Sequence, residues 1–493
     1  MLTQDALKVR ADSQPHREIF RCGEDNLTYG EWHRRSSALA LSFIEQGVQQ
    51  EECVALSFAM PEWINYVIAL LAVQKVGAIA VSLPSSAPAS IVQGIITRTA
   101  VRHSIGQSAF PGVNHLDGVA ASEAKDRFLD FRVETGPAAI AEIVVTSGST
   151  GVPKLVACPH GNLTWKTLSA SEAAKKFRDK TEQYLTHPPV GSNAAQRKVI
   201  SALRGTRCVY NILPYFDPAL VSQLIASRGI ETVALVPAKA AALLRACKGT
   251  SFGGVKRVHL SSAGTPSWVA EGLAQLFPNA TILNWYGLTE GGIFRIGGIY
   301  DGARPSWIGY PAERHSVRIT DDQGNKLPAG TSGQLWVRDS APYRRFYYPE
   351  GDTAVDGDGW MRTNDVASLD EDGAVTLTGR ASNIANVGGM KVTLTEVEEE
   401  VSTLEGVLDC AAFKLPHRTT GDMICIGIVS SPDDESRLEK AKARLAREFG
   451  YRFPRLWIKV PAIPRTFTGK VEREALAQIA LKQFPELDIN QEH

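Results

Sequence analysis

The sequence lacks the features that mark membrane proteins and nucleic-acid-binding proteins. Its longest apolar segment, around residues 66–73, is too short to span a bilayer, and its N-terminal residues show no basic-then-apolar signal pattern. The 53 Lys and Arg residues balance 53 Asp and Glu residues, so no net charge draws the chain to nucleic acid or to an anionic membrane. We therefore expect a cytoplasmic protein with no nucleic-acid partner and no membrane insertion.

The cysteines give no sign of a disulfide framework or of a structural zinc site. The seven cysteines are odd in number, scattered, and never spaced as C-x-x-C. This usage is typical of reduced thiols in an intracellular enzyme.

Helical segments that alternate with short apolar strands run through the first part of the chain. Residues 63–83 predict a buried helix, a break at Gly77 and a strand, and residues 220–237 repeat the pattern. Such alternation favours an α/β fold with largely parallel sheets. After about Gly309 short strands are joined by Asp-Gly turns, which is typical of antiparallel structure.

The last part of the chain predicts a separate small unit. An acidic amphipathic helix over residues 393–407 is followed by strands at 410–415 and 423–429 and a helix near 435–449. At 493 residues the chain is too long for one ordinary core. We predict a large N-terminal domain of α/β sheets with an antiparallel β subdomain over residues 1–381, and a small, mobile C-terminal α+β domain over residues 382–493, joined by a hinge.

One apolar run ends in the segment TSGSTGVPK, residues 146–154. Its glycines and hydroxyls suit an oxyanion-binding loop, although a Ser/Thr/Gly surface turn is the commoner explanation of such a cluster by itself. It does not match the nucleotide-binding pattern G-x-x-x-x-G-K-[ST], because Pro153 replaces glycine and Leu155 follows the lysine. A kinase or hydrolase built on this loop is therefore disfavoured.

Together with this loop, four further segments resemble those of the adenylate-forming superfamily, which includes acyl-CoA synthetases, firefly-type luciferases and the adenylation domains of nonribosomal peptide synthetases. The segments are NWYGLTEGG (284–292), RTNDVASLDEDG (362–373), GRASNIANVGGMKVTLTEVEEEV (379–401) and IPRTFTGKVEREAL (463–476). They occur in the family's order, and the resemblance extends over nearly the whole chain. The chain is most similar to a stand-alone acid ligase of the acyl-CoA synthetase type.

The resemblance implies an ATP-dependent, AMP-forming acid–thiol ligase. Such an enzyme activates a carboxylic acid to an acyl-adenylate, releases pyrophosphate and transfers the acyl group to coenzyme A. Transfer to the phosphopantetheine thiol of an acyl or peptidyl carrier protein, or to an amine, is the alternative. A non-catalytic member that binds acyl or nucleotide ligands is an alternative of another class. The implied cofactors are ATP, Mg²⁺ and coenzyme A or a phosphopantetheine carrier.

The resemblance assigns catalytic roles to three residues. Lys470 stabilises the negative charge that gathers on the pentacoordinate phosphorus, Thr289 donates to the α-phosphate, and Glu290 binds the metal, Mg²⁺. No general base is needed, because the carboxylate of the substrate is already the nucleophile. The implied ATP-binding residues are Thr146, Ser147, Gly148, Ser149, Thr150, Gly151, Lys154, Gly264, Asn284, Tyr286, Gly287, Asp365 and Arg380.

Within that set, Tyr286 is implied to stack on adenine and Asn284 to face its amino edge. Asp365 is implied to accept hydrogen bonds from both ribose hydroxyls, and Arg380 to contact ribose or phosphate. The chain has Asn364 where the family usually has glycine before this aspartate. Since asparagine tolerates the left-handed backbone, we expect the turn to survive.

The hinge is expected at Ser382, where the family usually has Asp or Lys. Serine can absorb a change of backbone conformation, so we expect rotation of the small domain to persist. Gly388 and Gly389 resemble the thiol tunnel of coenzyme A ligases, in which pantetheine passes backbone without side chains.

The acyl pocket is expected at Pro189, Val190, Ser192, Ala263, Gly287 and Gly291. Residues 184–198 contain no acidic side chain to pair an ammonium group, which disfavours an α-amino acid substrate. Gln196, Arg197 and Lys198 are polar where relatives are commonly apolar. We expect them on a solvated helix face; contact with a polar or anionic acyl group is the alternative.

Overall fold

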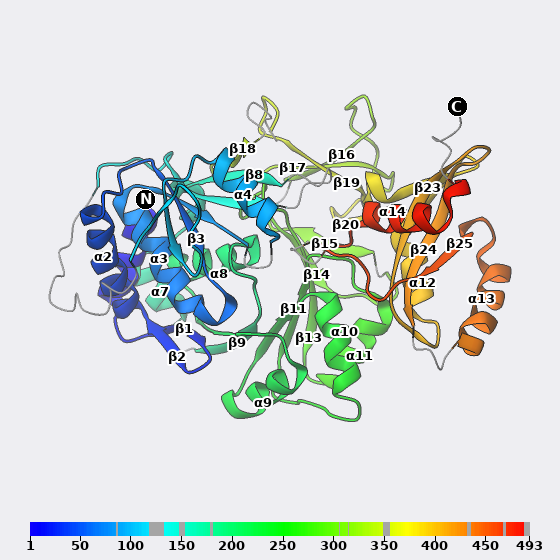
Figure 1. Cartoon of the computed structure of the whole chain (residues 1–493). Helices are drawn as coiled ribbons and strands as arrows, with labels where there is room; N and C mark the ends of the chain where they lie inside the picture. The colour runs from blue at the N-terminus through cyan, green and yellow to red at the C-terminus, as the bar shows by residue number, and fades with distance from the viewer. Residues whose placement is uncertain are drawn as a thin grey trace.

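The structure is a computed structural model that describes residues 1–84, 87–117, 133–146, 153–177, 181–304, 306–313, 315–348, 355–430, 435–466 and 470–487. Its described elements form three sheets with helices packed on them (Figure 1). The predicted fold class is confirmed: parallel α/β sheets come first, antiparallel strands follow, and the last part is a small α+β unit.

The largest sheet has thirteen strands and changes character along its width. Six neighbouring strands are parallel, and from β13 onward the pairing is antiparallel. The antiparallel region thus begins a little before the predicted Gly309. In spatial order the strands are β16 (Val317–Thr320), β17 (Gly333–Val337), β19 (Met361–Leu369), β20 (Val375–Arg380), β15 (Trp307–Pro311), β14 (Ile296–Ile299), β13 (Thr281–Tyr286), β12 (Arg257–Ser261), β11 (Thr232–Leu235), β9 (Glu182–Thr186), β10 (Cys208–Ile212), β1 (Glu18–Cys22) and β2 (Asp25–Thr28).

The second sheet has seven strands and is mainly parallel. Its order is β18 (Arg345–Tyr348), β8 (Lys154–Pro159), β7 (Ile140–Thr146), β4 (Ile79–Ser82), β3 (Cys53–Ser57), β5 (His103–Gly106) and β6 (Asn114–His115). The antiparallel pair β7 and β8 flanks the segment that was singled out as a phosphate loop.

The helices of this part are α1 (Thr3–Ser13), α2 (Tyr29–Glu45), α3 (Trp63–Val76), α4 (Ala89–Arg98), α6 (His160–Leu163), α7 (Ala170–Phe177), α8 (Asn193–Arg204), α9 (Pro218–Arg228), α10 (Pro237–Ala246) and α11 (Ser267–Leu276). Helix α3 is buried along almost its entire length, as its apolar sequence requires. It ends at Gly77, as predicted, and a φ of 80° there closes the helix in the left-handed conformation.

Helix α8 lies between the two large sheets. Val199 packs with Tyr184 and Tyr210 of the thirteen-stranded sheet, whereas Ile200 packs with Val144 of the seven-stranded sheet. Both sides of its middle turns are therefore covered by protein.

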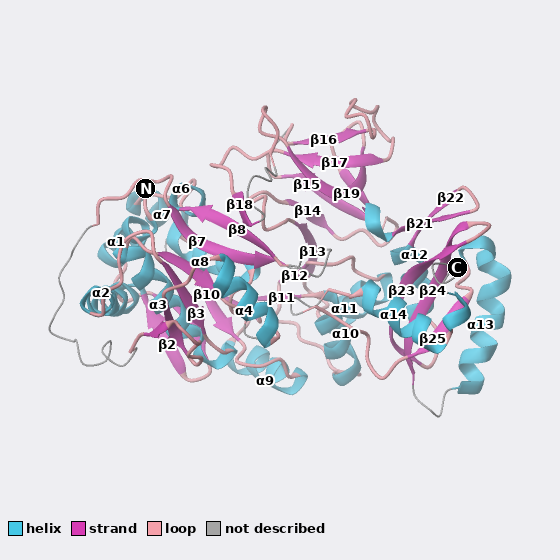
Figure 2. Cartoon of the chain, turned by 45° about the horizontal axis from the view of Figure 1, so that its top comes forward, coloured by secondary structure: helices cyan, strands magenta, loops and turns pink. Residues whose placement is uncertain are grey.

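The C-terminal unit has its own sheet, with order β22 (Met390–Thr393), β21 (Ile384–Val387), β24 (Gly421–Ser430) and β23 (Val407–His417), and with β25 (Leu456–Lys459) paired to β24. Helices α12 (Leu394–Ser402) and α13 (Glu435–Phe449) supply residues to one apolar cluster, and α14 (Arg473–Gln483) to another. Figure 2 shows this sheet as a group separate from the antiparallel strands β15 to β19. The strands and helices predicted past Arg380 are present.

The C-terminal unit contacts the rest of the chain through helix α12 and through β23, where Arg245 of α10 donates to the Leu408 carbonyl. The Ser267 hydroxyl donates to Glu399 Oε1 over 2.7 Å, and Trp268 Nε1 donates to Ser402 Oγ over 3.2 Å. Within the described residues, no helix is long and apolar enough to cross a membrane.

Candidate active site

A buried carboxylate lies where β13, β19 and β20 meet. Asp365 is 6% exposed, and Tyr286 Oη donates to its Oδ2 over 2.6 Å. Arg380, directly opposite in the β19–β20 register, brings Nε to 3.2 Å from Oδ1. Burial raises the pKa of Asp365, while the Arg380 guanidinium and the Tyr286 hydroxyl oppose that rise. Each carboxylate oxygen keeps a lone pair with which to accept a hydrogen bond from a ligand.

Asn364 lies within β19 at the point where the register with β17 shifts, and it bends the backbone before Asp365. Asn364 has a φ of 62°, in the left-handed region, which confirms the expectation for this departure from glycine. The Asp365 N–H donates to Thr363 Oγ1 over 3.1 Å, and Gln334 Nε2 donates to the Asp365 carbonyl over 3.0 Å. The backbone N–H and carbonyl of Asp365 are thus both hydrogen-bonded at this irregularity.

Two more predicted residues lie at the carboxyl ends of the parallel strands β12 and β13. Asn284 is buried, and its Oδ1 accepts a hydrogen bond from Thr265 Oγ1 over 3.2 Å. Thr265 belongs to the loop after β12, in which Ala263 and Gly264 are exposed. Ligands of open α/β sheets commonly bind at such strand ends. The structure thus brings Asn284, Gly264, Tyr286 and Asp365 to one edge.

The segment of residues 287–294, which carries Thr289 and Glu290, is held by two arginines. Arg344 is 2% exposed; its NH1 donates to the Thr289 carbonyl over 2.9 Å and its Nε to Asn162 Oδ1 over 2.8 Å. Arg197 NH2 donates to the carbonyls of Gly292 and Phe294 over 2.8 and 3.0 Å. Neither Arg344 nor Asn162 was predicted, because they lie far from this segment in sequence.

Gly292, near the end of the 287–294 segment, leaves room for the Arg344 side chain to approach the backbone. Gly292 has a φ of 60°, and a Cβ there would lie 2.7 Å from Asn162 Nδ2 and 3.1 Å from Arg344 Nε. A side chain at this position would strain the backbone and displace the side chains of Asn162 and Arg344.

Lys470 of the C-terminal unit interacts electrostatically with Glu290 and Asp365. Desolvation and then the Arg380 guanidinium lower the pKa of Lys470, whereas Glu290 and Asp365 act in the opposite direction. Lys470 keeps an exposed surface, and its N–H donates to Thr466 Oγ1 over 3.2 Å. A cation from the C-terminal unit thus interacts electrostatically with the carboxylates of Glu290 and Asp365, which lie at separate points of the N-terminal part.

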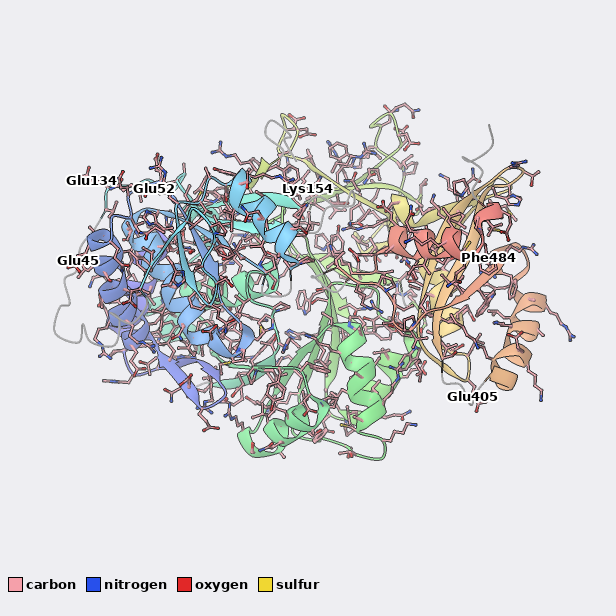
Figure 3. The ribbon with its side chains drawn as sticks, in the orientation of Figure 1. Glu45, Glu52, Glu134, Lys154, Glu405 and Phe484 are labelled. Atoms are coloured by element: carbon pink, nitrogen blue, oxygen red, sulfur yellow. The ribbon has the colours of Figure 1, made fainter. Side chains whose placement is uncertain are left out.

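The phosphate-loop residues are described only at their two ends. Thr146 ends β7 opposite Lys154, which starts β8. Ser147, Gly148, Ser149, Thr150 and Gly151 lie outside the described residues. Lys154 lies near the middle of the molecule (Figure 3), with its Nζ 4.6 Å from the centroid of the Phe346 ring.

The expected acyl-pocket residues divide into two groups. Ser192 caps helix α8: its Oγ accepts from the Ala195 N–H over 3.2 Å and donates to the Pro189 carbonyl over 2.5 Å, and Val190 beside it is buried. The others lie beyond β12 and β13, where a Cβ on Gly287 would be 2.9 Å from Arg197 NH2 and one on Gly291 would be 3.2 Å from Met361 Cε.

The expectation of a solvated face for Gln196, Arg197 and Lys198 is wrong. Gln196 is 1% exposed, and its Nε2 donates to the buried carboxylate of Glu142 over 2.7 Å. Arg197 donates to the 287–294 segment, and Lys198 donates to Tyr184. All three turn inward because helix α8 is enclosed by both sheets.

The two glycines expected in a thiol tunnel form a hairpin turn. Gly388 and Gly389 join β21 to β22 with φ values of 61° and 86°, which is the pattern of a type I′ turn. No atom of the described residues lies within 4 Å of a Cβ built on either glycine. Ser382 is exposed in a short 3-10 turn between β20 and β21.

Comparisons with known proteins agree with this arrangement. The family model described as AMP-binding enzyme matches residues 7–347. A 4-chlorobenzoate–CoA ligase from Arthrobacter is 27% identical over 479 residues, covering 92% of this chain and 90% of that protein. A 2,3-dihydroxybenzoate–AMP ligase from Bacillus subtilis is 26% identical over 517 residues, covering 96% of this chain and 93% of that protein. The solved structure of ATP-bound MatB from Rhodopseudomonas palustris superposes with a TM-score of 0.81 at 22% identity, over 98% of this chain and 99% of that chain, and supports the fold.

Proposed function

The chain belongs to the AMP-binding enzyme family, and on that premise we propose that it joins a carboxylic acid to a thiol through an acyl-adenylate, with coenzyme A as the acceptor. The observation that carries this proposal is the buried Asp365 carboxylate, which is held by Tyr286 and Arg380 and interacts electrostatically with Lys470. These residues come from four separate stretches of the chain, and their approach makes chemical sense around a nucleotide.

In the first step a carboxylate oxygen of the acid attacks the α-phosphorus of ATP. The bond from that phosphorus to the bridging oxygen breaks, and pyrophosphate leaves with the electron pair. Negative charge gathers on the phosphoryl oxygens, where Lys470 and Thr289 would stabilise it. Asp365 would hold the ribose hydroxyls, with Arg380 and Tyr286 keeping its carboxylate in place.

In the second step the thiol sulfur attacks the acyl carbonyl. The bond from the carbonyl carbon to the AMP oxygen breaks, AMP leaves and the thiol proton is released. Gly388 and Gly389 would let pantetheine pass, and their outward-facing turn would need to move toward the site for that role. A carrier-protein thiol or an amine remains the alternative acceptor.

Glu290 suits Mg²⁺. The described residues contain no group of three or more His, Cys, Asp and Glu side chains that could hold a metal by themselves. Magnesium is commonly held by one or two carboxylates together with substrate phosphates and waters, so a lone glutamate beside the triphosphate fits. The ion would neutralise charge on the departing pyrophosphate.

We further propose that residues 1–381 and 382–493 form two domains with their hinge at Ser382. The separate sheet and apolar clusters of the C-terminal unit support this division. The contacts through α12 include polar hydrogen bonds, as is common at interfaces between domains that move relative to each other.

Acid-dependent exchange of labelled pyrophosphate into ATP tests the proposed function. The wild-type chain should return label to ATP with at least one acid of a broad panel, followed by coenzyme A-dependent formation of a thioester. Lys470→Ala should slow adenylate formation by about 10²-fold or more while transfer from preformed acyl-AMP changes little. Lys482→Ala, an exposed lysine on α14, is the matched control. Equal slowing of both half-reactions would contradict a role of Lys470 specific to adenylate formation.

A further inference from the structure

Lys198 is a cation enclosed between helix α8 and the thirteen-stranded sheet. Its Nζ donates to Tyr184 Oη over 3.0 Å and lies 4.3 Å from the centroid of the same ring. The Tyr210 ring centroid lies 5.5 Å away. In the described part of the chain, no carboxylate forms an ion pair with Lys198. Its positive charge is therefore matched only by aromatic faces and one hydroxyl.

The Tyr184 hydroxyl links Lys198 to His259 through two hydrogen bonds. Because an ammonium group can only donate, Tyr184 Oη accepts from Lys198 and gives its own proton to His259 Nδ1, 3.1 Å away. His259 is neutral at physiological pH, since burial lowers its pKa to about 4. The imidazole proton must then be on Nε2, a donor for which the described residues supply no acceptor.

A second donor without a partner lies beside this histidine. Trp285 follows on the neighbouring strand, and the ring centroids of His259 and Trp285 are 5.9 Å apart. Trp285 Nε1 is buried and has no acceptor within the described residues. Like Lys198, His259 and Trp285 retain some accessible surface, whereas Tyr184 and Tyr210 are buried. Lys198, His259 and Trp285 are therefore partly accessible as residues, although Trp285 Nε1 itself is enclosed, while Tyr184 and Tyr210 behind them are packed.

Strand alternation places this set on the side away from the proposed adenine residues. Successive side chains of β13 point to opposite faces, so Trp285 projects opposite to Asn284 and Tyr286. In the parallel register Ser261 pairs with Trp285 and His259 with Leu283, which puts His259 on the face of Trp285. The acid would approach on this face if adenine occupies the other.

The neighbouring carboxylate does not balance the positive charge around Lys198, His259 and Trp285. Glu182 is the carboxylate that acts on His259, and it is already paired with Arg207 and Arg257, each at 2.6 Å. The Arg295 guanidinium lies 5.1 Å from the Trp285 ring centroid and increases the positive potential. A donor-only, net positive lining selects an anionic oxygen group.

We infer that the acid substrate carries a second carboxylate at the end remote from the one that is adenylated, and that Lys198, His259 Nε2 and Trp285 Nε1 recognise it. The inference rests on the proposed function and names the class of its acid: a dicarboxylic acid of which one carboxyl group reacts. It also assigns a role to Lys198 of α8, which was expected on a solvated face of the helix.

Paired acids of nearly equal shape test the inference. Terephthalate is compared with 4-methylbenzoate, and succinate with butyrate, in the pyrophosphate-exchange assay. The wild-type kcat/KM should favour the diacid of at least one pair by about tenfold or more, because a site built to bind a polar group discriminates strongly against its absence. Lys198→Met should lower that ratio by about tenfold or more, and Lys198→Arg should retain most of it.

Lys442→Met is the matched control, since Lys442 also lies over an aromatic ring, 4.9 Å from the Trp457 centroid, but on helix α13. It should leave the ratio unchanged. If Lys198→Met fails to fold, as judged by its thermal unfolding, His259→Leu supplies the same comparison. A wild-type preference for the monoacids, or an unchanged ratio in the folded variant, would overturn the inference alone. Absence of exchange with every acid of the broad panel would instead overturn the proposed function.

Discussion

Replacing Arg344 with methionine removes the guanidinium that ties the 287–294 segment to helix α6. Arg344 donates to the Thr289 carbonyl over 2.9 Å and to Asn162 Oδ1 over 2.8 Å. Methionine fills much of the same volume without either hydrogen bond. Thr289 and Glu290 would then lose the anchor on one side of their segment and keep only that of Arg197.

The expected effect on catalysis is larger than that on stability. Each hydrogen bond to a charged group contributes roughly 1.5–3 kcal/mol, but burying a guanidinium costs several kcal/mol. Since Arg344 is 2% exposed, these contributions offset one another, and the free energy of unfolding should fall by about 2 kcal/mol or less. A displacement of Thr289 and Glu290 by about 1 Å, in contrast, should cost about 10²-fold in rate.

Single-turnover formation of the acyl-adenylate at saturating ATP measures this effect, and urea unfolding measures stability. Arg345→Met is the matched control, because Arg345 is the exposed neighbour on β18. A wild-type rate in folded Arg344→Met would refute the positioning role. So would an equal loss of rate in the two variants.

Three further outcomes follow from the site and its surroundings. Arg380→Gln should raise the pKa of Asp365 further, so the acid limb of kcat/KM for ATP should move to higher pH; a limb that stays in place would contradict the Arg380–Asp365 pair. Burial lowers the pKa of His160 from 6.5 to about 4, so the neutral histidine contributes its full stability above pH 6.5 and loses it as the pH falls toward 4. Between pH 7 and 5, the free energy of unfolding in urea should fall by about 2 kcal/mol more in the wild type than in His160→Asn. Equal losses in the two proteins would argue against a neutral buried histidine. Asn364→Val should raise the KM for ATP, because valine is strained at the positive φ of this position, whereas Asn364→Gly should keep a KM near that of the wild type. Similar KM values for the two variants would show that the positive φ at residue 364 does not matter for ATP binding.

Features that depend on a residue's own conformational preferences were predictable from the sequence. Gly77 ends helix α3 in the left-handed conformation, and Asn364 adopts a positive φ where the family has glycine. The helix over residues 435–449 was likewise predicted with its bounds. At Gly77 and Asn364 local chemistry decides the structure, since glycine and asparagine accept backbone conformations that other residues avoid.

The environment of helix α8 was not predictable in the same way. Its polar residues 196–198 read as a solvated face, yet Gln196 is buried against Glu142 and Lys198 against Tyr184. Their burial depends on two sheets that close on the helix from opposite sides. Strands β9 and β10 flank the helix in sequence, but the seven-stranded sheet that carries Glu142 lies 54 positions from Gln196. A cation enclosed in this way is visible only after the layers are assembled.

By itself, the sequence determined the fold class, the family resemblance and the identity of Asp365, Glu290 and Lys470 as candidate site residues, because ordered motifs carry that information. Only the tertiary structure decided which distant residues support them. Arg344 meets the Thr289 carbonyl across 55 positions and Asn162 across 182. Such contacts are set by how strands and helices stack, and their energies arise from burial and geometry that no local pattern records.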